Sequence, residues 1–208
     1  MKLCMFTPKE LALERGWPGR IDGDRVVQLA AQTLQAFFTG GGSAREHAEY
    51  PLAEVDMRAP VLHPPSVRVF AGNDFVFANP AAIRGPGAIV ELPDGVTEIR
   101  PVLRRAALIG ADEAIGGFTL MNDWRAPALV GAKQHDFAIS LGPIVVTPDE
   151  LEDDGIDWPA LVATAARNTR LRPGDVLAAG ADERHAVGAG AVVELELPPF
   201  GVLRNTVA

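Results

Sequence analysis

Residues 116–146, with the sequence GGFTLMNDWRAPALVGAKQHDFAISLGPIVV, decide the fold because two apolar segments in this stretch predict two neighbouring strands. The first strand ends at Asp123, where the apolar alternation stops. The second is expected over Leu141–Val146, before a helix or turn start at Thr147–Glu150. A lone acid at a strand end directs one carboxylate above the sheet. Asp123 is therefore a candidate functional residue, although composition alone favours the alternative in which this acid caps a turn.

The loop between these strands carries the densest polar cluster in this half of the chain, Lys133-Gln134-His135-Asp136. A histidine exchanges protons near neutral pH, and a lysine supplies positive charge. The same residues are equally typical of a solvated loop. The sequence leaves open whether His135 and Lys133 face a pocket.

The composition excludes several classes of function. The formal charge of −8 argues against a nucleic-acid surface and against an acidic membrane surface as a partner. No apolar run is long and clean enough to span a bilayer, and the N-terminal segment has no signal-peptide core. The single cysteine, Cys4, allows no internal disulfide and fits a reducing compartment. We expect a cytoplasmic protein that binds neither nucleic acid nor membrane.

Asn122-Asp123-Trp124, followed by Asp136–Pro143 (DFAISLGP), resembles the fumarylacetoacetate hydrolase family, which carries N-D-W/V-S-A-R-D and then K-x-F-x-x-x-x-x-G-P. Further family marks follow in collinear order over roughly the whole chain: His63–Ser66 (HPPS), Asn79-Pro80, Arg84–Gly87 (RGPG), Arg172–Val176 (RPGDV) and Gly201–Asn205 (GVLRN). The resemblance implies an α+β, mostly β fold, with a mixed β-roll and a small N-terminal α/β lobe. It also implies a homodimer.

We divide the chain into a small N-terminal lobe at residues 1–62 and a β-roll domain at residues 63–208. In the lobe, the sequence predicts a strand, an Asp-Gly hairpin and two helical segments over residues 2–6, 20–27, 29–38 and 43–48. The chain's 21 glycines and 17 prolines favour short strands between turns in the larger domain. Those strands are expected over residues 67–70, 75–77, 88–92, 102–109, 175–178 and 192–197, with one helix over 158–168.

The resemblance implies a divalent metal (magnesium, manganese or calcium) held by three carboxylates. Two of them belong to an E-x-E on a strand that ends in I-G, where a spacing of two places both on one face, and the third is the Asp of the N-D pair. Counting back from Ile109-Gly110, the two glutamate positions are Val102 and Arg104, and neither side chain ligates a cation. Asp123 is the only surviving ligand position. We therefore expect no metal cofactor, and Mg²⁺ enters only if the alignment of Val102 and Arg104 is wrong.

Arg104 suggests what replaces the metal. A guanidinium about 4 Å from the ion would oppose each unit of its charge by about 4 kcal/mol at an effective dielectric near 20. A buried carboxylate without any partner is also costly. We predict that Arg104 takes the metal's place and forks onto Asp123. The alternative is a one-residue slip that turns Arg105 inward instead.

Other functional positions implied by the resemblance have also changed. The family lysine that stabilises the leaving fragment falls on His135, and Lys133 lies two residues earlier. The family helix that carries a water-activating His and Glu should follow Asn73, but Asn79 comes too soon for a helix to fit. The turn that binds substrate carboxylate reads Gly180-Ala181-Asp182, without a hydroxyl. Asn122 and Gly180 remain candidate substrate-binding positions.

Three functions remain open. The first is a metal-free enzyme acting on a small 1,3-dicarbonyl or 2-oxo acid, as a decarboxylase, tautomerase, dehydratase or cyclase rather than a hydrolase. In it, Arg104 binds substrate carboxylate or enolate, Asp123 and His135 handle protons, and Lys133 supplies charge. The second is a non-catalytic binding or dimerisation partner with the same fold. The third is an ordinary metal-dependent C–C bond hydrolase.

Overall fold

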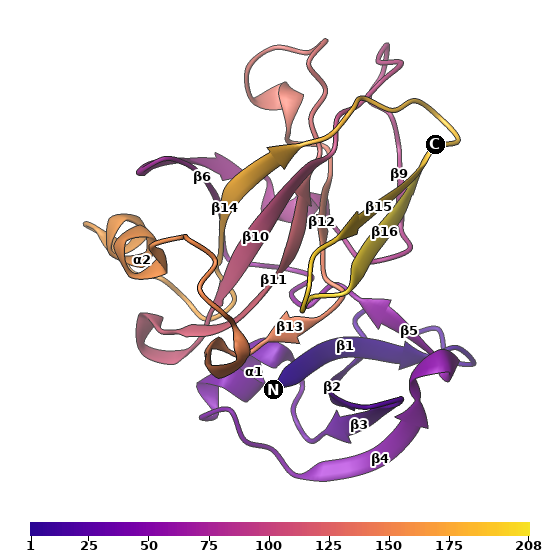
Figure 1. The fold of residues 1–208 in the computed structure, drawn as a ribbon, viewed down its shortest axis with the longest axis vertical. Coiled ribbons are helices and arrows are strands. Elements are labelled where there is room, and N and C mark those ends of the chain that lie inside the picture. Colours follow the sequence, from indigo (N-terminus) through magenta and orange to yellow (C-terminus); the bar gives the residue numbers. More distant parts are fainter.

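The computed structural model describes residues 1–208, and Figure 1 shows a β-rich body with two short α-helices. The N-terminal part comprises β1 (Lys2–Pro8), β2 (Trp17–Asp22), β3 (Arg25–Leu29), α1 (Leu34–Thr39), β4 (Glu46–Pro51) and β5 (Val55–Arg58). The predicted first strand and the predicted β2–β3 hairpin are confirmed. Gly23 makes the hairpin turn at a φ of 57°, a conformation that glycine adopts without steric cost.

Of the two helices predicted in the lobe, the first is confirmed in part and the second is wrong. The helix expected over 29–38 begins only at Leu34, because Leu29 ends β3 and Thr33 caps the helix by accepting a hydrogen bond from Ala36 N. The helix expected over 43–48 is instead the strand β4, which pairs with β3. The local helix propensity of these residues is overridden because the edge of β3 offers unpaired backbone N–H and C=O groups to a partner strand.

The larger part of the chain contains most of the strands and the second helix. These are β6 (Val67–Ala71), β7 (Asp74–Ala78), β8 (Ile83–Arg84), β9 (Ile89–Val90), β10 (Val102–Ile109), β11 (Ile115–Asp123), β12 (Ile139–Leu141), β13 (Val145–Val146), α2 (Trp158–Ala166), β14 (Val176–Glu183), β15 (Val192–Glu196) and β16 (Val202–Val207). The strands expected at 67–70, 75–77, 102–109, 175–178 and 192–197 and the helix at 158 are confirmed within a few residues. The strand expected at 88–92 shrinks to β9. We did not predict β16, because the inward Asn205 interrupts its apolar alternation.

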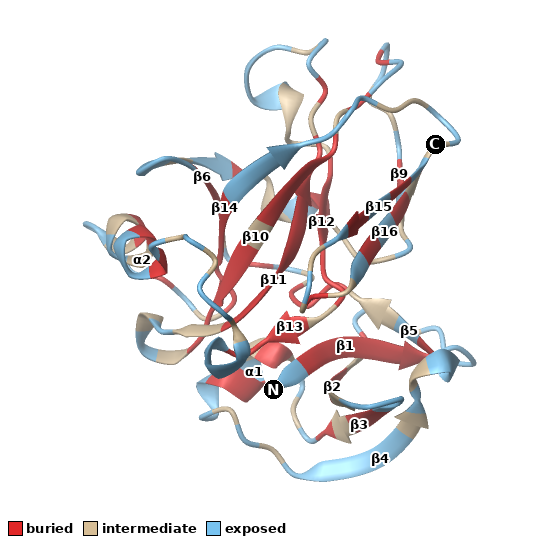
Figure 2. Cartoon of the chain, viewed as in Figure 1, coloured by how far each residue is buried: buried red, intermediate tan, exposed pale blue.

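The long strands β10 and β11 form the centre of the main sheet, whose order from the lobe outward is β4-β3-β2-β1-β13-β11-β10-β14-β6-β7. Figure 2 shows β10 and β11 buried along almost their whole length. Apolar side chains cover both faces of β10: Leu103 and Ala107 belong to one core cluster, and Ala106 and Leu108 to the other. The antiparallel strands are joined by parallel pairs at β14–β6 and β12–β8, so the sheet is mixed. The predicted mostly β, α+β fold is confirmed.

The second central strand differs from the prediction. Instead of one strand over Leu141–Val146, the chain forms β12 beside the end of β11 and then β13, which pairs with β1 and with the start of β11. Gly142, at a φ of 118°, and Pro143, which has no N–H, separate the two pieces. As a result, β12 holds the end of β11 at Asp123, while β13 connects the roll to the lobe.

Three polar side chains from the family-like sequence motifs form hydrogen bonds across the roll, most of them to residues of other motifs. Their hydrogen bonds are Ser66 Oγ to Asp175 Oδ1 at 2.7 Å, Asn79 Nδ2 to Asp136 O at 2.9 Å, and Asn205 Nδ2 to Gly85 O and Ala88 O at 3.1 and 3.0 Å. Each bond satisfies buried or partly buried backbone or carboxylate oxygens. These motifs therefore connect the loops and strands that surround β10 and β11.

The main sheet runs through both predicted domains because β1 pairs with β13. The division at residue 62 therefore stays a prediction. Neither α-helix has the length or the apolar run that crossing a bilayer requires.

Candidate functional site

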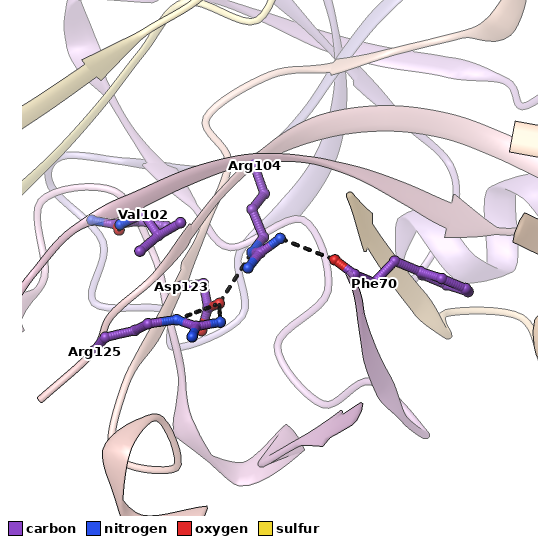
Figure 3. A network of polar contacts seen from close by, with 6 residues as sticks. Phe70, Val102, Arg104, Asp123 and Arg125 are labelled. Atoms are coloured by element: carbon purple, nitrogen blue, oxygen red, sulfur yellow. Dashed lines mark hydrogen bonds and ion pairs between the residues drawn. The ribbon is translucent and has the colours of Figure 1, made fainter. Parts of the chain in front are cut away.

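Arg104 and Asp123 lie on the same face of the two central strands. Leu103 pairs with Asn122 and Arg104 with Met121, and alternation along each strand then turns Arg104 and Asp123 to one side of the sheet. Arg104 Nε donates to Asp123 Oδ2 at 3.0 Å, so the predicted contact is present (Figure 3). The predicted fork is wrong, because Arg104 Nη1 donates to Phe70 O on β6, at 3.2 Å. Arg104 thus connects β10 to both β11 and β6.

A second guanidinium, that of Arg125, contacts the same carboxylate oxygen. Arg125 Nη2 and Nε lie 3.0 and 3.3 Å from Asp123 Oδ2, and Figure 3 shows Arg104 and Arg125 converging on Asp123. Two backbone hydrogen bonds between Arg100 and Arg125 keep the chain extended beyond the end of β11. Extended backbone places residues two apart on one side, so Arg125 lies on the side of Asp123. Sequence reasoning missed Arg125 because this extension depends on the pairing with Arg100.

The cluster of Arg104, Asp123 and Arg125 is unevenly buried and carries one positive charge in excess. The side chains of Asp123, Arg104 and Arg125 are 0%, 5% and 32% exposed. Burial lowers the pKa of Arg104, the attraction and hydrogen bond of Asp123 oppose that shift, and the nearby Arg125 adds to it. The other carboxylate oxygen, Asp123 Oδ1, is buried and has no hydrogen-bond partner. An unmet buried acceptor of this kind costs about 1–3 kcal/mol or more.

The alternative strand register, with Arg105 turned toward Asp123, is contradicted by the structure. Arg105 points to the opposite face of β10, where its Nε lies 3.5 Å from Asp154 Oδ2. There Arg105 lines a cavity of about 320 Å³ together with Leu197 and Phe200. Counting back from Ile109-Gly110 therefore assigns the faces correctly.

The residues at this position do not fit a divalent cation. Val102, on the same face as Arg104, is fully buried and offers no oxygen from its side chain. Oδ2 of Asp123 already accepts from two guanidiniums, and no three His, Cys, Asp or Glu side chains lie close enough together to hold a metal. Mg²⁺ and Ca²⁺ need six or more oxygen ligands, several of them usually carboxylates. A cation here would also meet the repulsion of Arg104 and Arg125.

The fold of the whole chain, though not its sequence, matches known proteins. No protein-family model matches the sequence, and no curated protein matches it either. Solved structures match over the full chain. Maleylpyruvate hydrolase from Sphingobium sp. SYK-6 in complex with manganese(II) and pyruvate has a TM-score of 0.81 at 20% identity, with 100% of this chain and 99% of that chain covered. The 5-carboxymethyl-2-hydroxymuconate delta-isomerase from Mycobacterium smegmatis has a TM-score of 0.78 at 22% identity, with the same coverage.

A third match, 2-keto-3-deoxy-D-arabinonate dehydratase complexed with magnesium and 2,5-dioxopentanoate, has a TM-score of 0.80 at 14% identity over 100% of this chain and 98% of that chain. This chain has the fumarylacetoacetate hydrolase fold. The matches are enzymes of three reaction types, a hydrolase, an isomerase and a dehydratase, so the fold by itself does not fix one reaction.

Other residues predicted on this fold are placed differently from the charged cluster. Asn122 Oδ1 accepts from Val102 N at 2.9 Å, so this side chain ties β11 to β10. Lys133 is 76% exposed and forms an ion pair with Asp136 at 2.9 Å. His135 is half-buried and makes no side-chain hydrogen bond. The structure thus brings Arg104 and Asp123 together and leaves Lys133 on the surface.

Gly180 lies in the middle of β14, where the resemblance to the fumarylacetoacetate hydrolase family implied a substrate-binding turn. The register there shifts, so that Gly180 and Ala181 both lie opposite Arg104. This is a β-bulge, and Gly180 provides the positive φ of 69° that the bulge needs. A Cβ at residue 180 would meet Ile156 Cδ1 at 3.1 Å and Arg105 Nη1 at 3.4 Å, so the residue faces Arg105 rather than Arg104.

The five main surface cavities lie away from the charged cluster. Their volumes range from about 230 to about 540 Å³, and none is lined by Arg104, Asp123 or Arg125. Asp123 itself is fully buried, and Arg125 is the one partly exposed member of the cluster.

Proposed function

We propose that this protein is a metal-independent enzyme that interconverts the oxo and enol forms of a small 2-oxo acid or 1,3-dicarbonyl, or carries out a related decarboxylation, dehydration or ring closure. The interconversion of oxo and enol forms passes through an enolate. The observation that carries the proposal is the Arg104–Asp123–Arg125 cluster, in which two guanidiniums share one carboxylate oxygen and leave the other oxygen free. An excess positive charge beside a free carboxylate oxygen suits an anionic substrate that must gain or lose a proton.

Each residue has a defined part in this proposal. Arg125, at the exposed side of the cluster, binds the substrate carboxylate through its planar pair of N–H groups. Arg104 stabilises negative charge on the carbonyl oxygen when the neighbouring carbon loses a proton and the electron pair moves to that oxygen. Asp123 and His135 carry the two protons of tautomerisation, one at carbon and one at oxygen. Lys133 is exposed and paired with Asp136, so we assign it no step in this proposal.

Hydrolysis is the less suitable reaction because the helix expected to carry a water-activating His and Glu is absent. The strands β6 and β7 are joined directly, with Ala71 paired to Asp74, so no helix follows Asn73. The compounds named with the matching structures, pyruvate and 2,5-dioxopentanoate, are small oxo compounds, which supports this substrate class. A homodimer, implied by the family resemblance, and a cytoplasmic location, inferred from the sequence composition, remain proposals.

A second candidate is a non-catalytic member of the fold that acts as a binding or dimerisation partner. It is favoured by the complete burial of Asp123 and by the absence of the cluster from the five main cavities. In that case the cluster serves only to join β6, β10 and β11. Metal-dependent hydrolysis is disfavoured by the donor set at Val102 and Arg104.

Hydrogen–deuterium exchange at carbon separates these functions. The protein is incubated in D₂O and EDTA with pyruvate or 2-oxobutanoate, and loss of the C3 proton signals is followed by NMR. We expect catalysed exchange that Asp123→Asn and Arg125→Gln abolish and that Arg105→Gln, the neighbouring arginine on the other face, leaves intact. Absence of exchange with or without metal supports the non-catalytic function. Exchange only with added Mn²⁺ or Mg²⁺ would refute the proposed metal independence.

A further inference from the structure

The largest of the five main surface cavities, about 540 Å³, lies where the lobe meets the roll. The lobe contributes β5 and residues of the loop that follows β1, and the roll contributes the 85–88 turn and Arg204 of β16. Cavities of this volume are typical of small-molecule sites. This cavity is separate from the Arg104–Asp123–Arg125 cluster and has no part in the proposed function.

Arg58, on β5, gives the cavity a positive charge that no carboxylate neutralises. Its Nε donates to Thr7 Oγ1 at 3.2 Å, and that hydroxyl donates in turn to Leu13 O at 3.3 Å. The side chain is half-buried, forms no ion pair, and makes no hydrogen bond through either Nη group. A guanidinium that is fixed at Nε and unbonded at both Nη groups presents a planar pair of donors to a carboxylate or a phosphate.

Two further cations, Lys9 and Arg204, line the same cavity. Lys9 forms no ion pair and donates from Nζ to Ala53 O at 2.7 Å, whereas Arg204 pairs with Glu194 at 3.2 Å. On a chain with a formal charge of −8, three cations around one cavity create a local attraction for anions. A phosphate monoester, with a charge of about −1.5 to −2 at pH 7, uses several cations better than a monocarboxylate does.

Hydrogen-bond acceptors and apolar groups form the rest of the lining. Asp56 and Glu14 are exposed and form no ion pair, and Asp56 lies two residues before Arg58 on the same side of β5. Because ionised carboxylates only accept hydrogen bonds, beside a bound anion they require a ligand that also carries donors, such as hydroxyl groups. Met57 and Leu62 offer apolar surface to a carbon skeleton.

We propose that this cavity is a binding site for a phosphorylated sugar or another phosphorylated polyol. The Nη groups of Arg58 bind the phosphate, Lys9 and Arg204 add positive charge around it, and the ligand hydroxyls donate to Asp56 and Glu14. Since Arg58 belongs to the lobe and Arg204 to the roll, the ligand contacts both parts of the chain. Its binding therefore stabilises the folded arrangement of the two parts against unfolding.

The test compares phosphorylated polyols with their separate components. Calorimetric titrations at low ionic strength use glucose 6-phosphate, ribose 5-phosphate and glycerol 3-phosphate, with inorganic phosphate, sulfate and the unphosphorylated polyols as controls. We expect at least one phosphorylated polyol to bind one-to-one, at least about tenfold more tightly than phosphate or sulfate, and to raise the urea midpoint of unfolding. The inference is overturned if no phosphorylated polyol binds, or if sulfate binds as tightly as the best of them.

Three variants assign the contacts. Arg58→Gln should weaken binding of the phosphorylated polyol at least about tenfold, because it removes the charged donors. The matched control is Arg25→Gln, which removes the same charge from a 62% exposed arginine outside the cavity and should leave the affinity unchanged. In Asp56→Ala, the advantage of the phosphorylated polyol over inorganic phosphate should shrink, because an acceptor for the hydroxyls is lost.

Equal weakening by Arg58→Gln and Arg25→Gln overturns the inference. An unchanged advantage of the phosphorylated polyol in Asp56→Ala overturns it as well. Asp56 is exposed, so its replacement should not impair folding. If Arg58→Gln does not fold, Asp56→Ala and the titrations of the unmodified protein still decide the question.

Discussion

Replacement of Arg104 by methionine tests how the charged cluster is held together. Arg104→Met keeps a long apolar side chain at a position that is 5% exposed, but it removes the bonds to Asp123 at 3.0 Å and to Phe70 O at 3.2 Å. Removing one partner from a buried ion pair costs about 3–5 kcal/mol. Arg125 remains beside Asp123, so we expect the lower end of that range, about 3 kcal/mol.

The matched control is Arg125→Met, on the same carboxylate oxygen. This side chain is 32% exposed, and a solvated ion pair contributes at most about 1 kcal/mol. With both arginines replaced, Asp123 is buried without any cation. The combined loss should therefore exceed the sum of the single losses by at least about 1 kcal/mol.

The assay is equilibrium unfolding in urea, with the free energy of unfolding and its urea dependence compared across the three variants. A fourth variant, Arg104→Met with Asp123→Leu, should regain much of the stability, because an apolar pair replaces a buried charge pair at little cost. The reasoning is refuted if Arg104→Met costs less than Arg125→Met. It is equally refuted if the two losses simply add.

Three further predictions concern the scaffold. Asn205→Asp replaces a donor to two carbonyls of the 85–88 turn by an acceptor, so we expect urea unfolding to show a loss of about 3 kcal/mol or more; an unchanged midpoint would contradict the role assigned to Asn205. Burial raises the pKa of the Cys4 thiol from 9.0 to about 12, so the folded state favours the neutral thiol. The resulting contribution to the free energy of unfolding is complete below pH 9. It falls by about 1.4 kcal/mol per pH unit toward pH 12, because only the unfolded chain loses the thiol proton in that range. Urea midpoints should show this decline relative to Cys4→Ala, and parallel pH curves would count against it. Gly116→Ala places a Cβ 2.5 Å from Phe38 Cγ and should lower stability by about 1–3 kcal/mol, with a normal midpoint as the contrary result.

The face of each central strand could be read from the sequence because β10 is regular. Ile109-Gly110 fixes the end of the strand, and a period of two then assigns Arg104 to the side of Asp123. Arg125 could not be assigned in the same way, because it lies beyond the last residue of β11. Its side is set by the backbone pairing with Arg100, which is a tertiary contact.

The largest error at element level, the helix expected where β4 forms, has the same origin. Residues 43–48 have a local helical preference, and pairing with β3 overrides it. The local structure at Gly180 could not be predicted, because a glycine alone does not distinguish a bulge from a turn; its substrate-binding role stays a prediction. Lys133 was placed near the site by its position in the sequence, whereas the loop that carries it pairs it with Asp136 at the surface.

The central claim is that the guanidiniums of Arg104 and Arg125 take the position of a divalent cation beside Asp123. The most direct measurement is a Mn²⁺ titration followed by electron paramagnetic resonance of the free ion. The unmodified protein should leave Mn²⁺ free, and the variant Val102→Glu, Arg104→Glu, Arg125→Ser should bind one ion per chain, because residues 102, 104 and 123 share one face. Binding of one Mn²⁺ by the unmodified protein, lost in Asp123→Asn, would contradict the account.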